Sequence, residues 1–210
     1  SFEYNVYSHY PSCWGHSKKE VYKKIADVYS TKKKYSKSAE YYTKIISLNN
    51  ELTDYEKADL YYKRGKAYAQ CNYSSDIKKA VDDLLFAETI YKQQGNDYYQ
   101  SQCFFYLAWA SYEMEDYQST IDYYTKAIEL RPDDAWAYNN RGVCYSELGL
   151  YKFAINDYDK AINLKPSSGL MYRNKGAALK NLGEPYCDYY KKACELGDES
   201  ACSFHNRSCY

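Results

Sequence analysis

The feature that most constrains the fold of this 210-residue chain is a segment that occurs twice, 34 residues apart. Residues 117–132 read YQSTIDYYTKAIELRP and residues 151–166 read YKFAINDYDKAINLKP, each copy closing on a proline, Pro132 or Pro166. Self-similarity at a fixed period is typical of proteins built from stacked structural repeats. Within each copy the apolar residues recur every three or four positions, which is the spacing of one helix face.

Turn and cap signals divide the repeats into pairs of helices. The two copies that span residues 101–168 each contain two helical stretches, separated by a turn at 115–116 or 148–149. Upstream, residues 17–20 (SKKE) and 53–56 (TDYE) have the form of capping boxes, which begin helices. The sequence therefore predicts an all-α chain of helix hairpins.

The second copy resembles the tetratricopeptide repeat (TPR) family, whose 34-residue unit interlocks large and small residues on two antiparallel helices. The matching residues, in order, are Tyr138, Gly142, Tyr145, Gly149, Tyr151, Ala154, Tyr158, Ala161 and Pro166. The first copy departs from the family pattern at Ala108, Ser111 and Thr120. The resemblance extends over most of the chain once insertions are allowed, and it implies a right-handed superhelix of about five hairpins.

The expected division has seven parts. These are an N-terminal strap (1–17), TPR-like repeat 1 (18–52), repeat 2 with an insertion around residues 72–79 (53–98), repeat 3 (99–134), repeat 4 (135–168), a shortened repeat 5 (169–197) and a capping helix (198–210).

The resemblance also implies a concave groove, lined by the first helix of each hairpin, that binds a peptide or a helix of a partner protein. The groove positions are Tyr62, Lys66, Phe105, Trp109, Tyr112, Trp136, Asn139, Asn140, Val143, Arg173 and Asn174. Aromatic residues are frequent interaction hot spots, and asparagines can pair with an extended backbone. One subclass of the family grips the C-terminal carboxylate of heat-shock chaperones. Of the five residues that it uses for this, only Asn140 is present here, so a chaperone-tail clamp is not expected.

Four cysteines lie near the C-terminus with regular spacing. If the chain turns at 197–199 between two helices, Cys194 faces Cys202 and Cys187 faces Cys209, and the two pairs lie about 10 Å apart along the helices. The repeat alignment also places Cys187 and Cys194 where isoleucines face the following helix. Two disulfides that hold a short capping helix are the preferred interpretation. Buried free thiols and a four-cysteine zinc site are the alternatives, and the spacing disfavours zinc.

Composition limits the remaining function classes. The formal net charge is zero, so no nucleic-acid partner is expected. Eight lysines lie between residues 18 and 37. They are interpreted as a solvent-exposed face, and a binding site for an anionic partner is the alternative. No apolar stretch approaches the ~20 residues that cross a bilayer. Disulfides favour an oxidising compartment, periplasmic or secreted, over the cytoplasm.

The sequence contains one cluster that could support metal or thiol chemistry. His9, Cys13 and His16 form the sole compact cluster of potential metal ligands, but their spacing matches no known motif, and an ordered strap that uses Trp14 is the simpler interpretation. Isolated cysteines at Cys71, Cys103 and Cys144 are expected to fill the core. No enzymatic activity, cofactor or metal is expected. The chain is predicted to be a protein-interaction scaffold, with a redox or metal-binding protein as the alternative.

Overall fold

The chain is an all-α solenoid of helical hairpins. The computed structural model describes residues 17–48, 52–71 and 74–209, and these ranges contain eleven helices and no strand. The helices are α2 (Lys18–Thr31), α3 (Tyr35–Ser47), α4 (Asp54–Ala69), α5 (Ser74–Gln93), α6 (Asp97–Glu113), α7 (Tyr117–Leu130), α8 (Ala135–Glu147), α9 (Tyr151–Leu164), α10 (Gly169–Leu182), α11 (Cys187–Glu195) and α12 (Glu199–Ser208). Each helix packs mainly against the next one along the chain.

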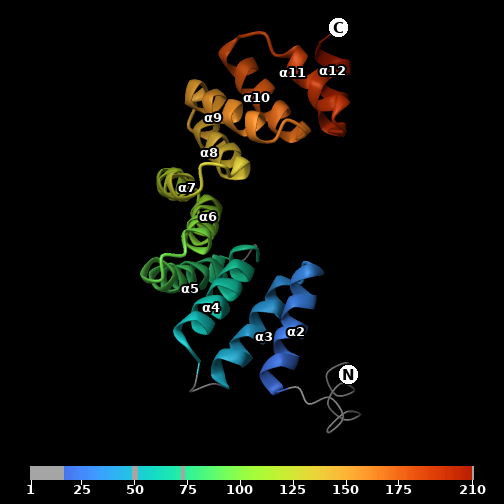
Figure 1. The fold of residues 1–210 in the computed structure, drawn as a ribbon. Helices are drawn as coiled ribbons and strands as arrows, with labels where there is room; N and C mark the ends of the chain where they lie inside the picture. Colours follow the sequence, from blue (N-terminus) through green and yellow to red (C-terminus); the bar gives the residue numbers. More distant parts are fainter. Residues whose placement is uncertain (1–16, 49–51, 72–73, 210) are drawn as a thin grey trace.

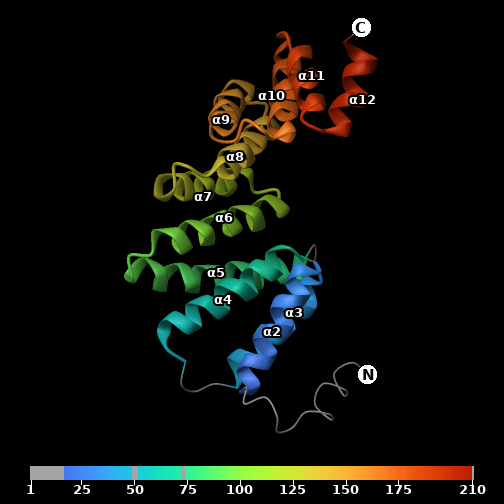
Figure 2. The ribbon, with the colours of Figure 1, turned by 45° about the vertical axis from the view of Figure 1, so that its right-hand side comes forward.

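The solenoid is curved. Helices α4 to α9 form a column, and the first hairpin (blue) and the last helices (red) lie on the same side of it (Figure 1). Helices α6 and α8 lie on that inner side, whereas α7 and α9 lie on the opposite, outer side. The view turned by 45° shows the same stack of hairpins from α4 upward (Figure 2). The curvature gives the chain an inner surface on which α6 and α8 are central.

The two predicted capping boxes are confirmed. The Ser17 hydroxyl accepts from the Glu20 backbone N–H, and Thr53 and Glu56 form the reciprocal pair at the start of α4. Lys19 of α2 also donates to Glu56, and this hydrogen bond is the main reason that the pKa of Glu56 is lowered to about 2. Two lysines of the first hairpin, Lys19 and Lys23, therefore form ion pairs with carboxylates of α4.

Small residues allow the two helices of a hairpin to approach closely. A Cβ atom at Gly142 would lie 2.8 Å from the Tyr158 ring, closer than carbon atoms pack, so glycine permits the contact between α8 and α9. The predicted turns at 115–116 and 148–149 are present. Each contains a residue with positive φ, Glu115 (59°) or Gly149 (72°), as the reversal between antiparallel helices requires.

The second hairpin accommodates its extra residues mainly by lengthening a helix. Helix α5 has 20 residues, whereas α7 and α9 have 14 each. Helix α6 begins at Asp97, two residues before the expected start of the third repeat, because the Asn96 side chain accepts from the Tyr99 N–H and caps it. None of the described helices is long and apolar enough to cross a membrane.

A buried ion pair ties three successive helices together at two places. Arg141 of α8 donates from Nε and Nη2 to the two carboxylate oxygens of Asp157 on α9, both at 2.8 Å, and from Nη1 to Thr125 of α7 at 3.0 Å. Two hairpins earlier, Arg64 of α4 makes the same contacts, from Nε and Nη2 to Asp83 of α5 and from Nη1 to Thr43 of α3. The pair fixes α8 against both of its neighbours.

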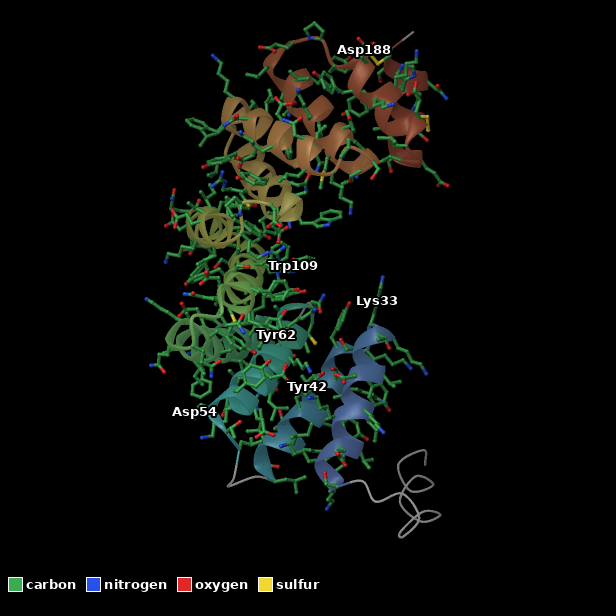
Figure 3. The ribbon with its side chains drawn as sticks, viewed as in Figure 1. Lys33, Tyr42, Asp54, Tyr62, Trp109 and Asp188 are labelled. Atoms are coloured by element: carbon green, nitrogen blue, oxygen red, sulfur yellow. A yellow bond between two sulfur atoms is a disulfide. The ribbon has the colours of Figure 1, made fainter. Side chains whose placement is uncertain are left out.

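The last helix, α12, covers the end of the solenoid. Phe204 stacks on Tyr190 of α11 with ring centroids 4.1 Å apart, and Ala201 is fully buried. Disulfides join Cys187 to Cys209 and Cys194 to Cys202, with Cα–Cα distances of 5.7 and 4.6 Å (Figure 3). These are the two pairs expected from the sequence, and no described cysteine of this end is left as a zinc ligand.

Candidate partner-binding groove

The inner surface carries a small cavity between α6 and α8. Trp109, which lies on the inner side of α6, forms one wall (Figure 3). The volume is about 180 Å³, and the full lining is Trp109, Tyr112, Glu113, Tyr124, Asn140 and Val143. We call it the Trp109 cavity. Helix α7 contributes its floor through Tyr124, which reaches between the two inner helices.

A chain of hydrogen bonds between side chains supports the cavity. Asn174 of α10 donates to the Oδ1 of Asn139 at 3.0 Å, and Asn139 donates to the Oδ1 of Asn140 at 3.0 Å. Asn140 in turn donates to the Tyr124 hydroxyl at 3.3 Å. Asn139 is only 2% exposed. The expectation that Asn139 contacts a partner directly is therefore wrong for this structure, because neighbouring amides already use its hydrogen-bonding groups.

A second, wider hollow also involves α6 and α8. Its volume is about 480 Å³, and it lies between α6, the α7–α8 loop and the end of α9. Phe105, Tyr106 and Trp136 are its aromatic lining, and Trp136 is 41% exposed. The Lys165 ammonium lies 4.7 Å from the Trp136 ring. We call it the Trp136 hollow. Phe105, Trp109, Tyr112 and Trp136 thus line two spaces that both involve α6 and α8.

The groove residues predicted for the second hairpin do not line either space. Tyr62 is only 7% exposed, because the rings of Tyr91, Tyr99 and Tyr106 surround it at centroid distances of 5.7 to 6.5 Å. Its position in the groove was wrongly predicted, and it belongs to the core. Lys66 lies 5.0 Å from the Tyr106 ring centroid.

Arg173, the last predicted groove residue, joins the inner surface to the cap. Its Nε lies 2.9 Å from the Asp198 carboxylate, although the N–H is not aligned for a hydrogen bond, so the contact is an ion pair. Asp198 also accepts from the Ala201 N–H and caps α12. Arg173 therefore has a structural partner at the C-terminal end of the groove.

Comparisons with known proteins agree with this architecture. Three family models match: a tetratricopeptide repeat at residues 20–52, a TPR repeat at 110–149 and a tetratricopeptide repeat at 135–168. The chain belongs to the tetratricopeptide repeat family. The predicted resemblance is confirmed, and so is the all-α fold class.

Solved TPR structures superpose on most of the chain. The MamA protein is 25% identical with a TM-score of 0.65, and the match covers 88% of this chain and 94% of that one. YrrB, described as a TPR protein with an unusual peptide-binding site, is 18% identical with a TM-score of 0.63 and covers 89% and 90%. Hsp70-Hsp90 organizing protein 2 of Arabidopsis thaliana is 25% identical over 99 residues, which are 45% of this chain and 15% of that protein.

Two acidic residues of the site were not singled out by the sequence prediction. Glu113 lines the Trp109 cavity, and Glu147 lies close enough to influence the ionisation of Tyr112. They are the last residues of α6 and α8 and lie 34 residues apart. The 34-residue period of the sequence could therefore have predicted that they occupy equivalent positions. Tyr124 is both buried and part of the cavity lining.

The structure describes some of the cysteines and histidines that were considered for metal or redox chemistry, but not all of them. His9, Cys13 and His16 lie outside the described residues. Within the described ranges, no group of three or more His, Cys, Asp or Glu side chains is placed to hold a metal ion. Cys71, Cys103 and Cys144 are free and buried, as expected for residues that fill the core of TPR hairpins.

The free thiols of the third and fourth hairpins are expected to be unreactive in the native state. Cys103 and Cys144 are fully buried, and burial is the main reason that the pKa of the Cys144 thiol rises to about 12, so almost no thiolate is present at neutral pH. Alkylation with iodoacetamide, followed by peptide mass mapping, should leave both residues unlabelled in native protein. The same residues should be fully labelled in denaturant. Fast native labelling of either one would show an accessible, activated thiol.

Proposed function

We propose that this chain is a non-enzymatic scaffold that binds an extended segment of a partner protein along its inner surface, with Trp109 and Trp136 as anchors. TPR repeats and the scaffold-like relatives support a protein-interaction role. The observation that carries the finer proposal is the pair of spaces on α6 and α8, because each is lined by a tryptophan side chain. Tryptophan is one of the residues that are enriched among interface hot spots.

A heat-shock chaperone tail is not the proposed partner. The plant relative is named for Hsp70 and Hsp90, but its match covers 15% of that protein. Among the clamp positions, this chain has Phe105, Trp109 and Leu170 in place of polar or basic residues. The remaining matching residue, Asn140, is engaged by Tyr124 and Asn139. The proposed ligand is therefore a segment with large side chains that fill the two spaces.

An oxidising compartment, such as a periplasm or a secretory lumen, forms part of the proposal. Two cysteine pairs at disulfide distance are compatible with such a compartment, since disulfides persist there and are rare where thiols are kept reduced.

Replacing both tryptophans should abolish binding without unfolding the chain. A phage-displayed library of 12-residue random peptides is selected on the native protein, and the enriched peptides are synthesised. Their affinities for Trp109→Ala/Trp136→Ala should fall by about 30-fold or more, because each tryptophan is an interface anchor. Fluorescence anisotropy measures the affinities, and circular dichroism melting checks that the variant folds.

Phe153→Ala is the matched control for this experiment. Phe153 is a 59% exposed aromatic residue on the outer helix α9, outside both spaces. Its replacement should leave peptide affinity unchanged. Peptides that bind the double variant as tightly as the native chain would contradict the assignment of the groove.

A further inference from the structure

The Trp109 cavity has aromatic walls and one acidic residue. Trp109 and Tyr112 come from one inner helix and Tyr124 lies beneath them, while Glu113 closes one side. No basic residue is part of the lining. A volume of about 180 Å³ is suited to one long side chain rather than to a whole peptide segment. The cavity therefore selects a single side chain of the partner by its chemistry.

Several sources of negative potential meet at this cavity. Glu113 is the last residue of α6 and Glu147 the last residue of α8, and the final turns of both helices contain no basic residue. The C-terminal end of a helix carries a partial negative charge, so each carboxylate adds to the potential of the helix that it closes. Burial, and after it the charge of Glu147, raises the pKa of Tyr112. The charge of Glu147 thus acts on a residue of the cavity wall.

This negative charge has no counterion in the described part of the chain. Among residues 17–48, 52–71 and 74–209, no lysine, arginine or histidine lies within ion-pair distance of Glu113 or Glu147. The arginine of α8, Arg141, instead pairs with Asp157 and donates to Thr125. The Trp136 hollow differs in this respect, because it contains Arg131 and Lys165 together with two aspartates.

We infer that the Trp109 cavity binds an arginine or lysine side chain of the partner, stacked on Trp109 with its charge directed at Glu113. Aromatic faces attract cations, and tryptophan does so most strongly. The aliphatic stem of either basic side chain packs on Tyr112 and Val143, which a compact cation would not do. An apolar side chain of equal length would fill the space but would remove water from Glu113 without pairing it, which costs free energy. This inference rests on the proposed function and specifies its ligand.

The test uses peptides from the library selection whose affinity falls on Trp109→Ala/Trp136→Ala. In each peptide, every arginine or lysine is replaced in turn by norleucine, which keeps the stem and removes the charge. One replacement per peptide should weaken binding to the native chain by about tenfold. The variant Glu113→Gln/Glu147→Gln should weaken the parent peptide by a similar factor and leave the affinity of the norleucine peptide unchanged. Glu129→Gln, an exposed carboxylate outside both spaces, is the control and should change neither.

The outcomes separate this inference from the proposed function. Tryptophan-dependent peptides that need no basic residue, or that bind Glu113→Gln/Glu147→Gln as well as they bind the native chain, would overturn the inference and leave the proposed groove intact. A selection that yields no tryptophan-dependent peptide would overturn both.

Discussion

The variant Asp157→Ala is expected to unfold about 3 kcal/mol more easily than the native chain. Its carboxylate is the only acceptor for the Nε and Nη2 groups of Arg141 among the described residues, and removing it leaves a largely buried guanidinium without a counterion. Breaking a buried ion pair costs about 3–5 kcal/mol, and the lower value applies because the Arg141 side chain is 16% exposed and can recruit some water. Urea denaturation followed by circular dichroism measures the change.

The third hairpin supplies the matched control for this prediction. Leu107 and Tyr123 stand 34 residues before Arg141 and Asp157, so an apolar pair occupies the same positions there. The double variant Arg141→Leu/Asp157→Tyr copies that pair and should recover most of the lost stability, to within about 1 kcal/mol of the native value. If the double variant is as unstable as Asp157→Ala, the loss comes from packing at residue 157 and not from an unpaired charge.

The two ion pairs illustrate what the 34-residue period could and could not predict. The period, the family resemblance and the cysteine spacing together predicted the turns, the small residue at 142 and the cysteine pairs, because each of these follows from where a residue falls within a pair of helices. Arg141 and Asp157 also hold fixed positions in the repeat, yet the third hairpin replaces them with apolar residues. A pair that is present in some hairpins and absent in others is recognised only when the two side chains are seen to meet.

The groove prediction failed where neighbouring helices supply the environment. Assigning a residue to the inner face says which way its side chain leaves its own helix but not what covers it. Tyr62 is covered because the long helix α5 carries Tyr91 over it, and Asn139 is covered because Asn174 arrives from the next hairpin. Trp109 and Trp136 were predicted from the same alignment, and here the adjacent hairpins leave an open space beside each ring. The exposure of a side chain on the surface of a repeat thus depends on the residues that the neighbouring helices place over it.

Removing both disulfides by the four-alanine variant at Cys187, Cys194, Cys202 and Cys209 is expected to release the capping helix. Helices α11 and α12 have nine and ten residues, too short to persist without tertiary support. A bridge that closes a loop with a sequence separation of 22 stabilises by about 3 kcal/mol, and the inner bridge, with a separation of 8, adds less because the outer loop already encloses it. Hydrogen exchange of α10 to α12 and thermal melting measure the loss.

The effect should be confined to the C-terminal end, because each hairpin of a solenoid contacts only its neighbours. Without α12, Tyr190 and Ala193 lose the cover of Phe204 and Ala201, so exchange should rise through α11 and fade toward α8. Peptide affinity at the Trp109 cavity should be unchanged. Reductant should cause the same loss of exchange protection in the native chain and have no effect on these helices in the four-alanine variant. The comparison distinguishes the contribution of the disulfide bonds from that of side-chain packing by the cysteines. Equal exchange in oxidised and reduced native protein would show that packing alone holds the cap.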